Sequence, residues 1–265
     1  MHITLDKKFE FLAPFKMDEM IRIGANGDGG YVLPKSIIYQ CDALISLGVS
    51  ADWSFDQHFS ELNPKIFVHG YDYSISGSLF KKSAIKGALK FLLFLGSLKE
   101  VRYRFELYQA YKKFFSGRNV HYEERVFSRN FEKFDITIDQ IFKRVSAKNC
   151  FLKVDIEGSE YRIIDDILRH SQYIPGMAFE FHETDPYRIQ FVESVQKIQK
   201  YYKIVHFHIN NSTGIASDGL PETIEMTFIK NEYCNTNEKN YELPIEGLDF
   251  KNDLKKIDYK LSFEK

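Results

Sequence analysis

Acidic and imidazole side chains follow the apolar runs of this sequence at several separate places. Asp72 ends the run KIFVHGYD (65–72), and Asp155 and Glu157 come directly after FLKV at 151–154. Glu180 and His182 lie in MAFEFH (177–182), where polar and apolar residues alternate. Carboxylates and imidazoles can take a proton from a reacting hydroxyl group, accept hydrogen bonds from a ligand, or bind a divalent metal.

A second pair of imidazoles follows the same alternation in YKIVHFHI (202–209). His206 and His208 would share one face of a strand because they are two residues apart, and Asn210 follows at the strand's end. Together with Glu180 and His182 they could bind a divalent metal, but no pair has the spacing of a dedicated metal motif. A partly solvated sheet face explains the same pattern, so the question of a metal stays open.

The segments that must position these residues alternate between strands and helices. The expected strands are ALISLG (43–48), KIFVHGYD (65–72), NVHYEERVFS (119–128), NCFLKVDI (149–156), MAFEFH (177–182), YKIVHFHI (202–209) and TIEMTFI (223–229). A helix is expected after residue 158, and another carries Ile189, Val192, Val195 and Ile198 on one stripe. This alternation predicts an α/β protein with a mostly parallel sheet covered on both faces.

The last two strands break the alternation. The segment between them, NNSTGIASDGLPE, is rich in Gly, Asn and Ser and has no helical periodicity. Without a crossover helix the two strands should meet as an antiparallel hairpin. We therefore predict a parallel sheet that finishes in one antiparallel hairpin.

Ligands of open α/β sheets bind outside the carboxyl ends of the strands. Gly48-Val49-Ser50, Asp72, Asp155, Glu157, Glu180, His182, His208 and Asn210 are all expected along that edge. Each also has a structural explanation: Gly48 could make a tight turn, and the three carboxylates nearest to helix starts could cap them. The pattern alone favours neither explanation.

A glycine-rich turn, ANGDGGYVLP (25–34), leads into a further strand. It lacks the Gly-Lys-Ser/Thr ending of a phosphate-binding P-loop. It could be a hairpin turn with glycine at positive φ, or a backbone cradle that lets a ligand approach closely. In the second case Asp28 and Tyr31 would contact the substrate.

Two segments lie outside the alternation. Residues 78–118 are expected to be helical and hold ten Lys/Arg against two Glu, which suggests an acidic partner: a phosphorylated substrate or an anionic membrane surface. Residues 231–265 form a polar tail that we expect to be mostly irregular, with a short terminal element.

Composition narrows the class of protein. The net charge of −1 argues against a nucleic-acid partner. The longest apolar stretch, ALKFLLFLGSL (88–98), contains a lysine and is too short to span a bilayer, which leaves only peripheral membrane contact open. Cys41, Cys150 and Cys234 form no metal motif and fit reduced thiols, and the start of the chain has no apolar leader, so we expect a cytoplasmic protein.

Several stretches resemble the FkbM-type S-adenosylmethionine-dependent methyltransferases. The most specific is DIEGSE within LKVDIEGSEYRII, and IRIGANGDGGYVL and LPIEGLDF also match. ALISLGVSADWSFDQHF, FEFHETD and HFHINNSTG look like the branch found in bacterial surface-polysaccharide gene clusters. The resemblance implies a class I (Rossmann-like) methyltransferase: one domain over residues 1–265, with a seven-stranded sheet, an antiparallel seventh strand and a helical insertion between strands two and three.

Site residues follow from this resemblance by position. Gly48 and Ser50 would lie by the methionine part of S-adenosylmethionine, Asp72 by the ribose, Arg125 and Val126 by the adenine, and Asp155 by the methyl group. Asp28, Tyr31, Glu157, Glu180 and Asn210 would contact the substrate. One departure is clear, because the GxGxG after strand one is here Gly48-Val49-Ser50-Ala51-Asp52.

The implied reaction is O-methyl transfer with S-adenosylhomocysteine as product. The acceptor would be a sugar hydroxyl, or a phosphate or phosphoramidate-type group, in capsule or surface-glycan synthesis. A hydroxyl needs a general base, for which Asp155, His182 and His208 are the candidates, or a divalent metal. An anionic acceptor would need cations from 78–118 instead. A non-catalytic ligand-binding protein of the same fold is the alternative, and a Rossmann-type oxidoreductase would need the missing G-x-G-x-x-G.

Overall fold

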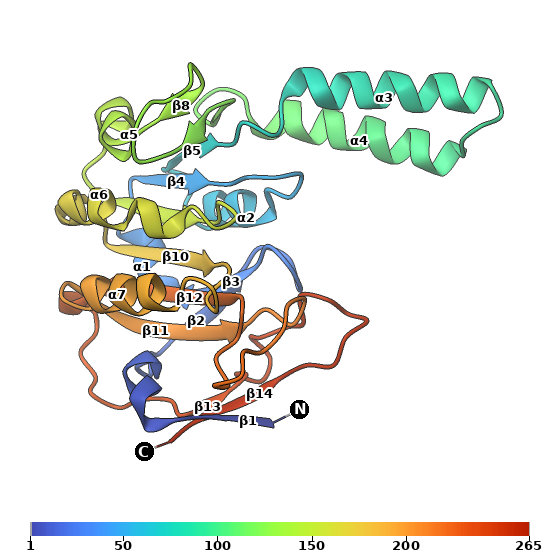
Figure 1. Cartoon of the computed structure of the whole chain (residues 1–265). Helices are drawn as coiled ribbons and strands as arrows, with labels where there is room; N and C mark the ends of the chain where they lie inside the picture. The colour runs from blue at the N-terminus through green and yellow to red at the C-terminus, as the bar shows by residue number, and fades with distance from the viewer. Residues whose placement is uncertain (1, 265) are drawn as a thin grey trace.

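The computed structural model describes residues 2–264. Its main sheet has seven strands and lies at the centre of the molecule (Figure 1). The order across the sheet is β11-β12-β10-β9-β4-β5-β6. The strands are β4 (Ala43–Leu47), β5 (Phe67–Tyr71), β6 (Val120–Tyr122), β9 (Cys150–Val154), β10 (Gly176–Phe181), β11 (Tyr202–Ile209) and β12 (Ile224–Lys230). The parallel core of the sheet is confirmed by the pairings of β4 with β5 and β9, of β5 with β6, and of β9 with β10.

The predicted hairpin is also confirmed. β12 pairs antiparallel with β11, and it pairs antiparallel with β10 on its other side. The last strand therefore lies between the two strands that precede it in the chain. It is the antiparallel seventh strand of an otherwise parallel sheet.

Apolar layers cover both faces of this sheet, because successive strand residues point to opposite sides. Ile45 and Leu47 of β4 pack with the buried sides of the helices α5 (Ile138–Val145), α6 (Ile164–Arg169) and α7 (Arg188–Ile198). Leu44 packs on the other face with α1 (Lys35–Tyr39), α2 (Ser54–Leu62) and strand β3 (Tyr31–Pro34). None of the helices in residues 2–264 is both long and apolar enough to cross a membrane.

The apolar stripe predicted for the helix around 189–198 is wrong at Ile189, whereas Val192 packs against the core. Val195 and Ile198 are buried, but Ile189 is 70% exposed. Phe191 points toward the sheet instead, and its ring makes an edge-to-face contact with Phe181 of β10. Apolar residues surround most of this helix, so periodicity alone did not show which of them faces the sheet.

The predicted third strand, 119–128, is split in two. β6 ends at Tyr122, and β7 (Arg125–Val126) leaves the main sheet to pair with β8 (Asp135–Ile136). The Arg125 guanidinium donates to both carboxylate oxygens of Asp135, at 2.8 and 3.1 Å, and holds the two short strands together. This turn brings Arg125 and Val126 to the carboxyl edge of the sheet.

The tail after residue 230 is mostly irregular and contains a short terminal strand, as expected, and that strand joins a second, three-stranded sheet with a strand near the start of the chain. β14 (Lys260–Phe263) lies between β1 (His2–Leu5) and β13 (Glu242–Leu243). Leu261 and Phe263 are buried in the main core. The glycine-rich turn joins β2 (Met20–Ile23) to β3 as an antiparallel hairpin, with Gly24 and Gly29 at positive φ.

Between β5 and β6 the chain forms two helices, α3 (Gly77–Leu92) and α4 (Leu98–Phe114). They pack against each other as a hairpin that projects away from the body on the side toward which the arrowheads of β4 and β10 point (Figure 1). The base of this hairpin is fixed by Phe80 and Tyr111, whose rings contact Trp53 with centroids 5.9 and 5.8 Å apart. Short 3₁₀ helices at Lys7–Leu12, Glu160–Arg162, Ser171–Tyr173 and Asn231–Tyr233 complete the secondary structure.

Candidate functional site

A cavity of about 470 Å³ opens at the carboxyl ends of β4, β5 and β9. Every residue that the sequence placed around a cofactor lines it: Gly48, Ser50, Asp72, Arg125, Val126 and Asp155, together with Glu157. The other lining residues are Tyr71, Tyr73, Ser74, Glu124, Phe127, Ile156, Ser159 and Arg162. Asp72 and Asp155 come from separate parts of the chain and meet because the parallel strands β5 and β9 end at one edge.

Asp72 organises the loop that follows β4. One carboxylate oxygen accepts hydrogen bonds from the backbone N–H groups of Val49 and Ser50, at 3.0 and 2.7 Å. The other accepts from the backbone and the hydroxyl of Ser74, at 2.7 and 2.6 Å. Burial works to raise the pKa of Asp72, but these hydrogen bonds outweigh it and keep the pKa below its ordinary value.

Gly48 directly follows β4, next to the end of the neighbouring parallel strand β9. Its φ is 81°, and a Cβ atom at this position would lie 1.6 Å from the carbonyl oxygen of Asp155. The backbone N–H of Asp155 in turn donates to Leu47 at 2.9 Å. Glycine is therefore required by the close approach of two strand ends, which also sets the position of the Asp155 side chain.

A buried lysine that the sequence analysis did not select also positions Asp155. Lys153, 4% exposed, donates to the Gly48 carbonyl at 2.8 Å and to Asp155 at 3.3 Å. The Tyr31 hydroxyl reaches the same carboxylate oxygen at 3.5 Å. Burial works to lower the pKa of Lys153, but the charges of Asp155 and Asp56 raise it overall, so the lysine stays charged. Its signal in the sequence was a single charge inside the apolar strand CFLKV.

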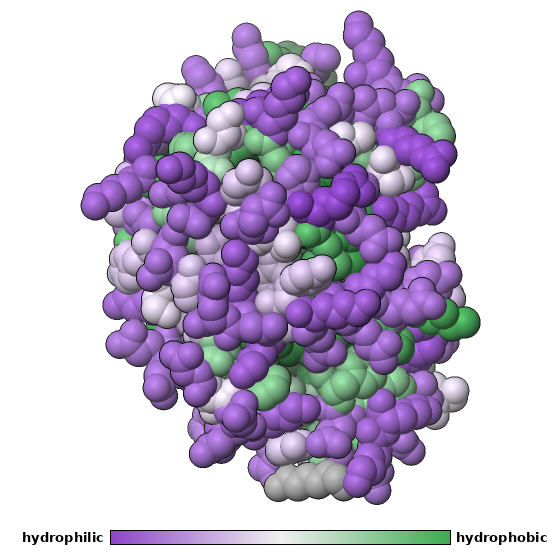
Figure 2. All heavy atoms as spheres, turned by 90° about the vertical axis from the view of Figure 1, so that its left-hand side faces the viewer, coloured by the Kyte–Doolittle hydropathy of each residue, from purple (hydrophilic) through white to green (hydrophobic). Residues whose placement is uncertain are grey.

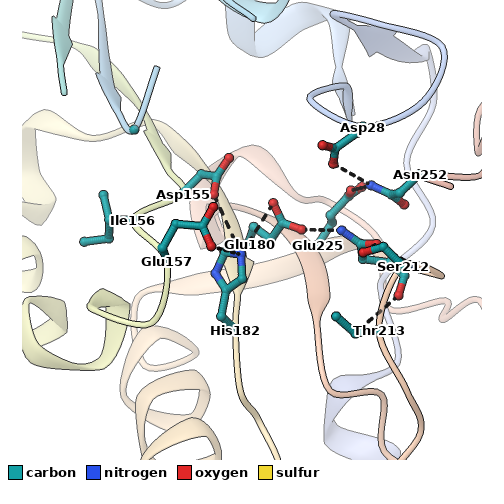
Figure 3. Close-up of polar contacts among 12 residues, drawn as sticks. Asp28, Asp155, Ile156, Glu157, Glu180, His182, Ser212, Thr213, Glu225 and Asn252 are labelled. Carbon is teal, nitrogen blue, oxygen red and sulfur yellow. Dashed lines mark hydrogen bonds and ion pairs between the residues drawn. The ribbon is translucent and has the colours of Figure 1, made fainter. Parts of the chain in front are cut away.

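His182 lies among four carboxylates, of which Figure 3 labels Asp155, Glu157 and Glu180. Its Nδ1 is 3.1 Å from Glu160, and its Nε2 is 3.5 Å from Glu157, 3.9 Å from Asp155 and 4.0 Å from Glu180. Burial works to lower the pKa of His182, but the hydrogen bond to Glu160 and the surrounding negative charges raise it to about 9. The ring therefore carries a proton at neutral pH.

Glu160 is a second residue that the sequence analysis missed. It is fully buried, and the carboxylate oxygen that binds His182 also accepts from the backbone N–H groups of Ile156 and Gly158, at 3.1 and 3.2 Å. The turn that carries these groups contains a non-glycine residue at positive φ, Glu157 at 53°, followed by Gly158 at 90°. Such strained backbone is frequent at functional sites.

A second group of carboxylates continues from Glu180 toward the tail. Glu180 accepts a 2.6 Å hydrogen bond from the Asn210 amide. Asn252 of the tail donates to Glu225 at 2.6 Å and to Asp28 at 3.2 Å, so three distant segments meet (Figure 3). Burial and the nearby charges of Asp155 and Glu225 raise the pKa of Glu180 well above its ordinary value.

His208 does not reach the cavity. It is 3% exposed, and its Nδ1 is 3.1 Å from the buried carboxylate of Glu225. Its neighbour His206 pairs with Asp249 of the tail at 2.8 Å. The tail covers the strand face that carries both imidazoles, which the sequence alone did not indicate.

Two groups of side chains have donor atoms close enough to share a cation. The first group is Asp155, Glu157 and His182, and the second is Asp28, Glu180 and Glu225. Within each group, the possible ligand atoms all lie within 4.8 Å of one another. The first set resembles metal sites in which the second nitrogen of a ligating histidine binds a carboxylate, here Glu160. Two carboxylates and an imidazole are suitable ligands for a divalent cation.

The geometry of the site thus combines a cavity, a carboxylate at the end of β5 and an acidic cluster at the ends of β9 and β10. Residues 101–213 match the Methyltransferase FkbM domain. This segment includes Arg125, Asp155 and His182, whereas Gly48 and Asp72 lie before it. Over this segment, which is less than half of the chain, the sequence is similar to the FkbM methyltransferases.

One solved structure that resembles this chain is a fibrillarin pre-rRNA processing protein from Methanococcus jannaschii, with 11% sequence identity and a TM-score of 0.38. The match covers 73% of this chain and 68% of the fibrillarin chain. A precorrin-6y C5,15-methyltransferase from Geobacter metallireducens has 10% identity, 74% and 86% coverage and a TM-score of 0.38. The plantazolicin methyltransferase BpumL in complex with SAH has 9% identity, 74% and 79% coverage and a TM-score of 0.34. Among curated proteins, none matches the chain significantly.

Proposed function

We propose that this chain is one methyltransferase domain that transfers the methyl group of S-adenosylmethionine to a sugar hydroxyl in a bacterial surface glycan or its precursor. The observation that carries the proposal is the joint position of Asp72 and Asp155 on one cavity, with His182 beside it. The bacterial glycan context comes from the sequence resemblance.

The cavity offers suitable groups for each part of the cofactor. Asp72 would accept hydrogen bonds from the ribose hydroxyls. Its two oxygens already accept four hydrogen bonds, of which the Ser74 hydroxyl at 2.6 Å can rotate away without loss of backbone structure. Arg125 and Val126 would lie along the adenine, and Gly48 and Ser50 near the methionine part. Asp155 would lie next to the positively charged sulfonium, which supplies the methyl group.

His182 is the proposed general base. A base must be neutral to take a proton, and in the structure the surrounding carboxylates keep the imidazole charged at neutral pH. A sulfonium next to Asp155 would add a positive charge to this cluster and so lower the pKa of His182. Cofactor binding and deprotonation of the base would then be coupled.

The surroundings of His182 favour a neutral acceptor over a phosphate or phosphoramidate-type group. Asp155, Glu157 and Glu160 contribute negative charges that would repel an anion, whereas the accessible carboxylates of Asp155 and Glu157 can accept hydrogen bonds from sugar hydroxyls. Among the described residues that line the cavity, the cations are Arg125 and Arg162, and none comes from 78–118. Arg125 is already paired with Asp135.

A divalent cation is a second way to activate a hydroxyl here. Asp155, Glu157 and His182 would hold it, and it would supply Lewis-acid chemistry that lowers the pKa of the acceptor hydroxyl. Metal analysis of the purified protein, with activity measured before and after chelation, separates this route from base catalysis by His182.

The test of the acceptor measures S-adenosylhomocysteine release from the full chain. Separate reactions contain neutral sugars, sugar phosphates and a phosphoramidate, with His182→Gln as the comparison variant. We expect turnover with a neutral sugar and its loss in the variant. Turnover with the anionic acceptors alone would contradict the sugar assignment. Cofactor binding without turnover on any acceptor would support a non-catalytic binding protein.

A further inference from the structure

The outer part of the α3–α4 hairpin exposes large apolar side chains that nothing in the described residues covers. At the turn between the two helices, Leu92, Leu93, Phe94 and Leu95 are 70%, 67%, 96% and 73% exposed. Phe94 has a φ of 57°, a conformation that bulky residues rarely adopt. Between residues 81 and 110 only Gly87 is buried, so the helices pack on each other without a third layer.

Figure 2 views the molecule from the side opposite this hairpin, where the surface is mostly hydrophilic with small, separate apolar patches. Scattered apolar residues of that kind are normal on a soluble protein, whereas a contiguous exposed apolar surface marks an interaction site. The residues of the turn at 91–95 form such a surface, which we call the apolar tip.

Positive charge surrounds the apolar tip. The segment 78–118 holds ten Lys/Arg and two Glu, and both glutamates are already paired within α4, Glu100 with Arg104 and Glu106 with Arg102. Lys86, Lys90 and Lys99 beside the tip are exposed and have no ion-pair partner among residues 2–264. Long lysine side chains can lie along apolar surface while their ammonium groups reach anionic groups.

We propose that the α3–α4 hairpin binds the surface of an anionic lipid bilayer, with the apolar tip among the headgroups and its lysines paired with lipid phosphates. Only Phe91 and Leu92 of the tip belong to α3, and the other residues lie in the turn. The tip therefore has no single helical face, and it suits a fluid interface better than a protein groove that contacts one face. A second copy docked hairpin to hairpin would bring two strongly positive segments together, which is unfavourable.

Membrane binding would also orient the enzyme. The hairpin is about 24 Å long, from sixteen residues in α3 at 1.5 Å each. Its base contacts Trp53, in the loop that begins with the cavity residues Gly48 and Ser50. The hairpin projects on the side of the carboxyl edge (Figure 1), so that edge would face the membrane. Binding itself does not depend on the proposed methyl transfer.

The test is co-sedimentation of the full chain with vesicles of phosphatidylcholine alone or with added phosphatidylglycerol. We expect binding to the anionic vesicles, at least tenfold weaker binding to the neutral ones, and loss at high salt. Replacing the tip by L92S/F94S/L95S should reduce binding at least tenfold. The variant K86Q/K90Q/K99Q should bind the anionic vesicles more weakly, by about fivefold for each lysine that lies near the membrane surface.

The matched control is L254S/I257S, which changes two residues of the tail that are 78% and 74% exposed. Its binding should equal that of the unchanged chain. Equal binding by the tip variant, or no binding of the unchanged chain to anionic vesicles, would overturn the proposal. A dimer in lipid-free buffer that dissociates in the tip variant, seen by light scattering, would assign the tip to a second copy instead.

Discussion

His182 has four carboxylates within 4.0 Å of its ring nitrogens. Carboxylates lie against both of its nitrogens, and Glu160, fully buried, fixes the orientation of the ring. The same charges that position the imidazole also hold a proton on it, since they raise its pKa to about 9. A bound positive charge is needed to reverse this, and the proposed cofactor carries one.

His182→Gln should lower kcat by about 10² to 10⁴-fold, the usual contribution of a general base. In the unchanged enzyme kcat/KM should rise with pH up to about 9, because it reports the free enzyme. The corresponding rise in kcat should occur at lower pH, because the bound sulfonium opposes protonation. Rates of S-adenosylhomocysteine formation across pH measure both profiles.

His170→Gln is the matched control, because His170 pairs with Asp139 outside the cavity. Its profiles should match those of the unchanged enzyme. An alkaline rise of equal height and position in His182→Gln would exclude His182 as the base.

At the scale of elements, the site depends on how closely the ends of β4 and β9 approach. Gly48→Ala places a Cβ atom 1.6 Å from the Asp155 carbonyl at a φ of 81°. Forced separation of the strand ends and the strained backbone should together lower the free energy of unfolding by about 2–5 kcal/mol. Cofactor binding should weaken as Asp155 is displaced.

Gly117→Ala separates these two causes. Gly117 also has a positive φ, 66°, but no atom lies within 4 Å of its added Cβ. The free energy of unfolding of the Gly117→Ala variant should therefore fall by only about 1–2 kcal/mol. Chemical denaturation of both variants measures the difference. Equal losses at the two positions would mean that the contact with Asp155 is unimportant.

The sheet could be predicted from the sequence because its signals are local. Seven apolar runs, the helical stripes and the loop before Ile224 are each visible within a short window, and the edge where Asp72 and Asp155 meet follows from parallel strands. Lys153 and Glu160 could not be selected in this way, because their roles depend on burial and on partners far along the chain. The contacts of the tail could not be predicted for the same reason, because Asp249 and Asn252 bind His206 and Glu225, which lie far away in the sequence.

Across the whole molecule, buried ionisable groups make stability depend on pH. His182 has a raised pKa in the folded state, so its stabilising contribution is full below about 6.5 and is lost as pH rises through about 9. Burial works to raise the pKa of Asp249, but His206 outweighs it and lowers the pKa to about 2. The contribution of Asp249 is therefore lost as pH falls from about 4 toward 2.

We therefore expect the free energy of unfolding to be greatest at mildly acidic pH and to fall toward pH 9 by up to about 3 kcal/mol through His182. Urea denaturation at a series of pH values measures this in the presence of a chelator. The alkaline decline should flatten in His182→Gln. A stability that rises between pH 7 and pH 9 would contradict the charged cluster.

The most direct test of the account is a crystal structure of the chain with S-adenosylhomocysteine. We predict that the nucleoside lies in the cavity with its ribose hydroxyls on Asp72 and that the open side of the sulfur faces Asp155 and His182. A ligand bound elsewhere, or an empty cavity at a saturating concentration of the ligand, would contradict the central claim.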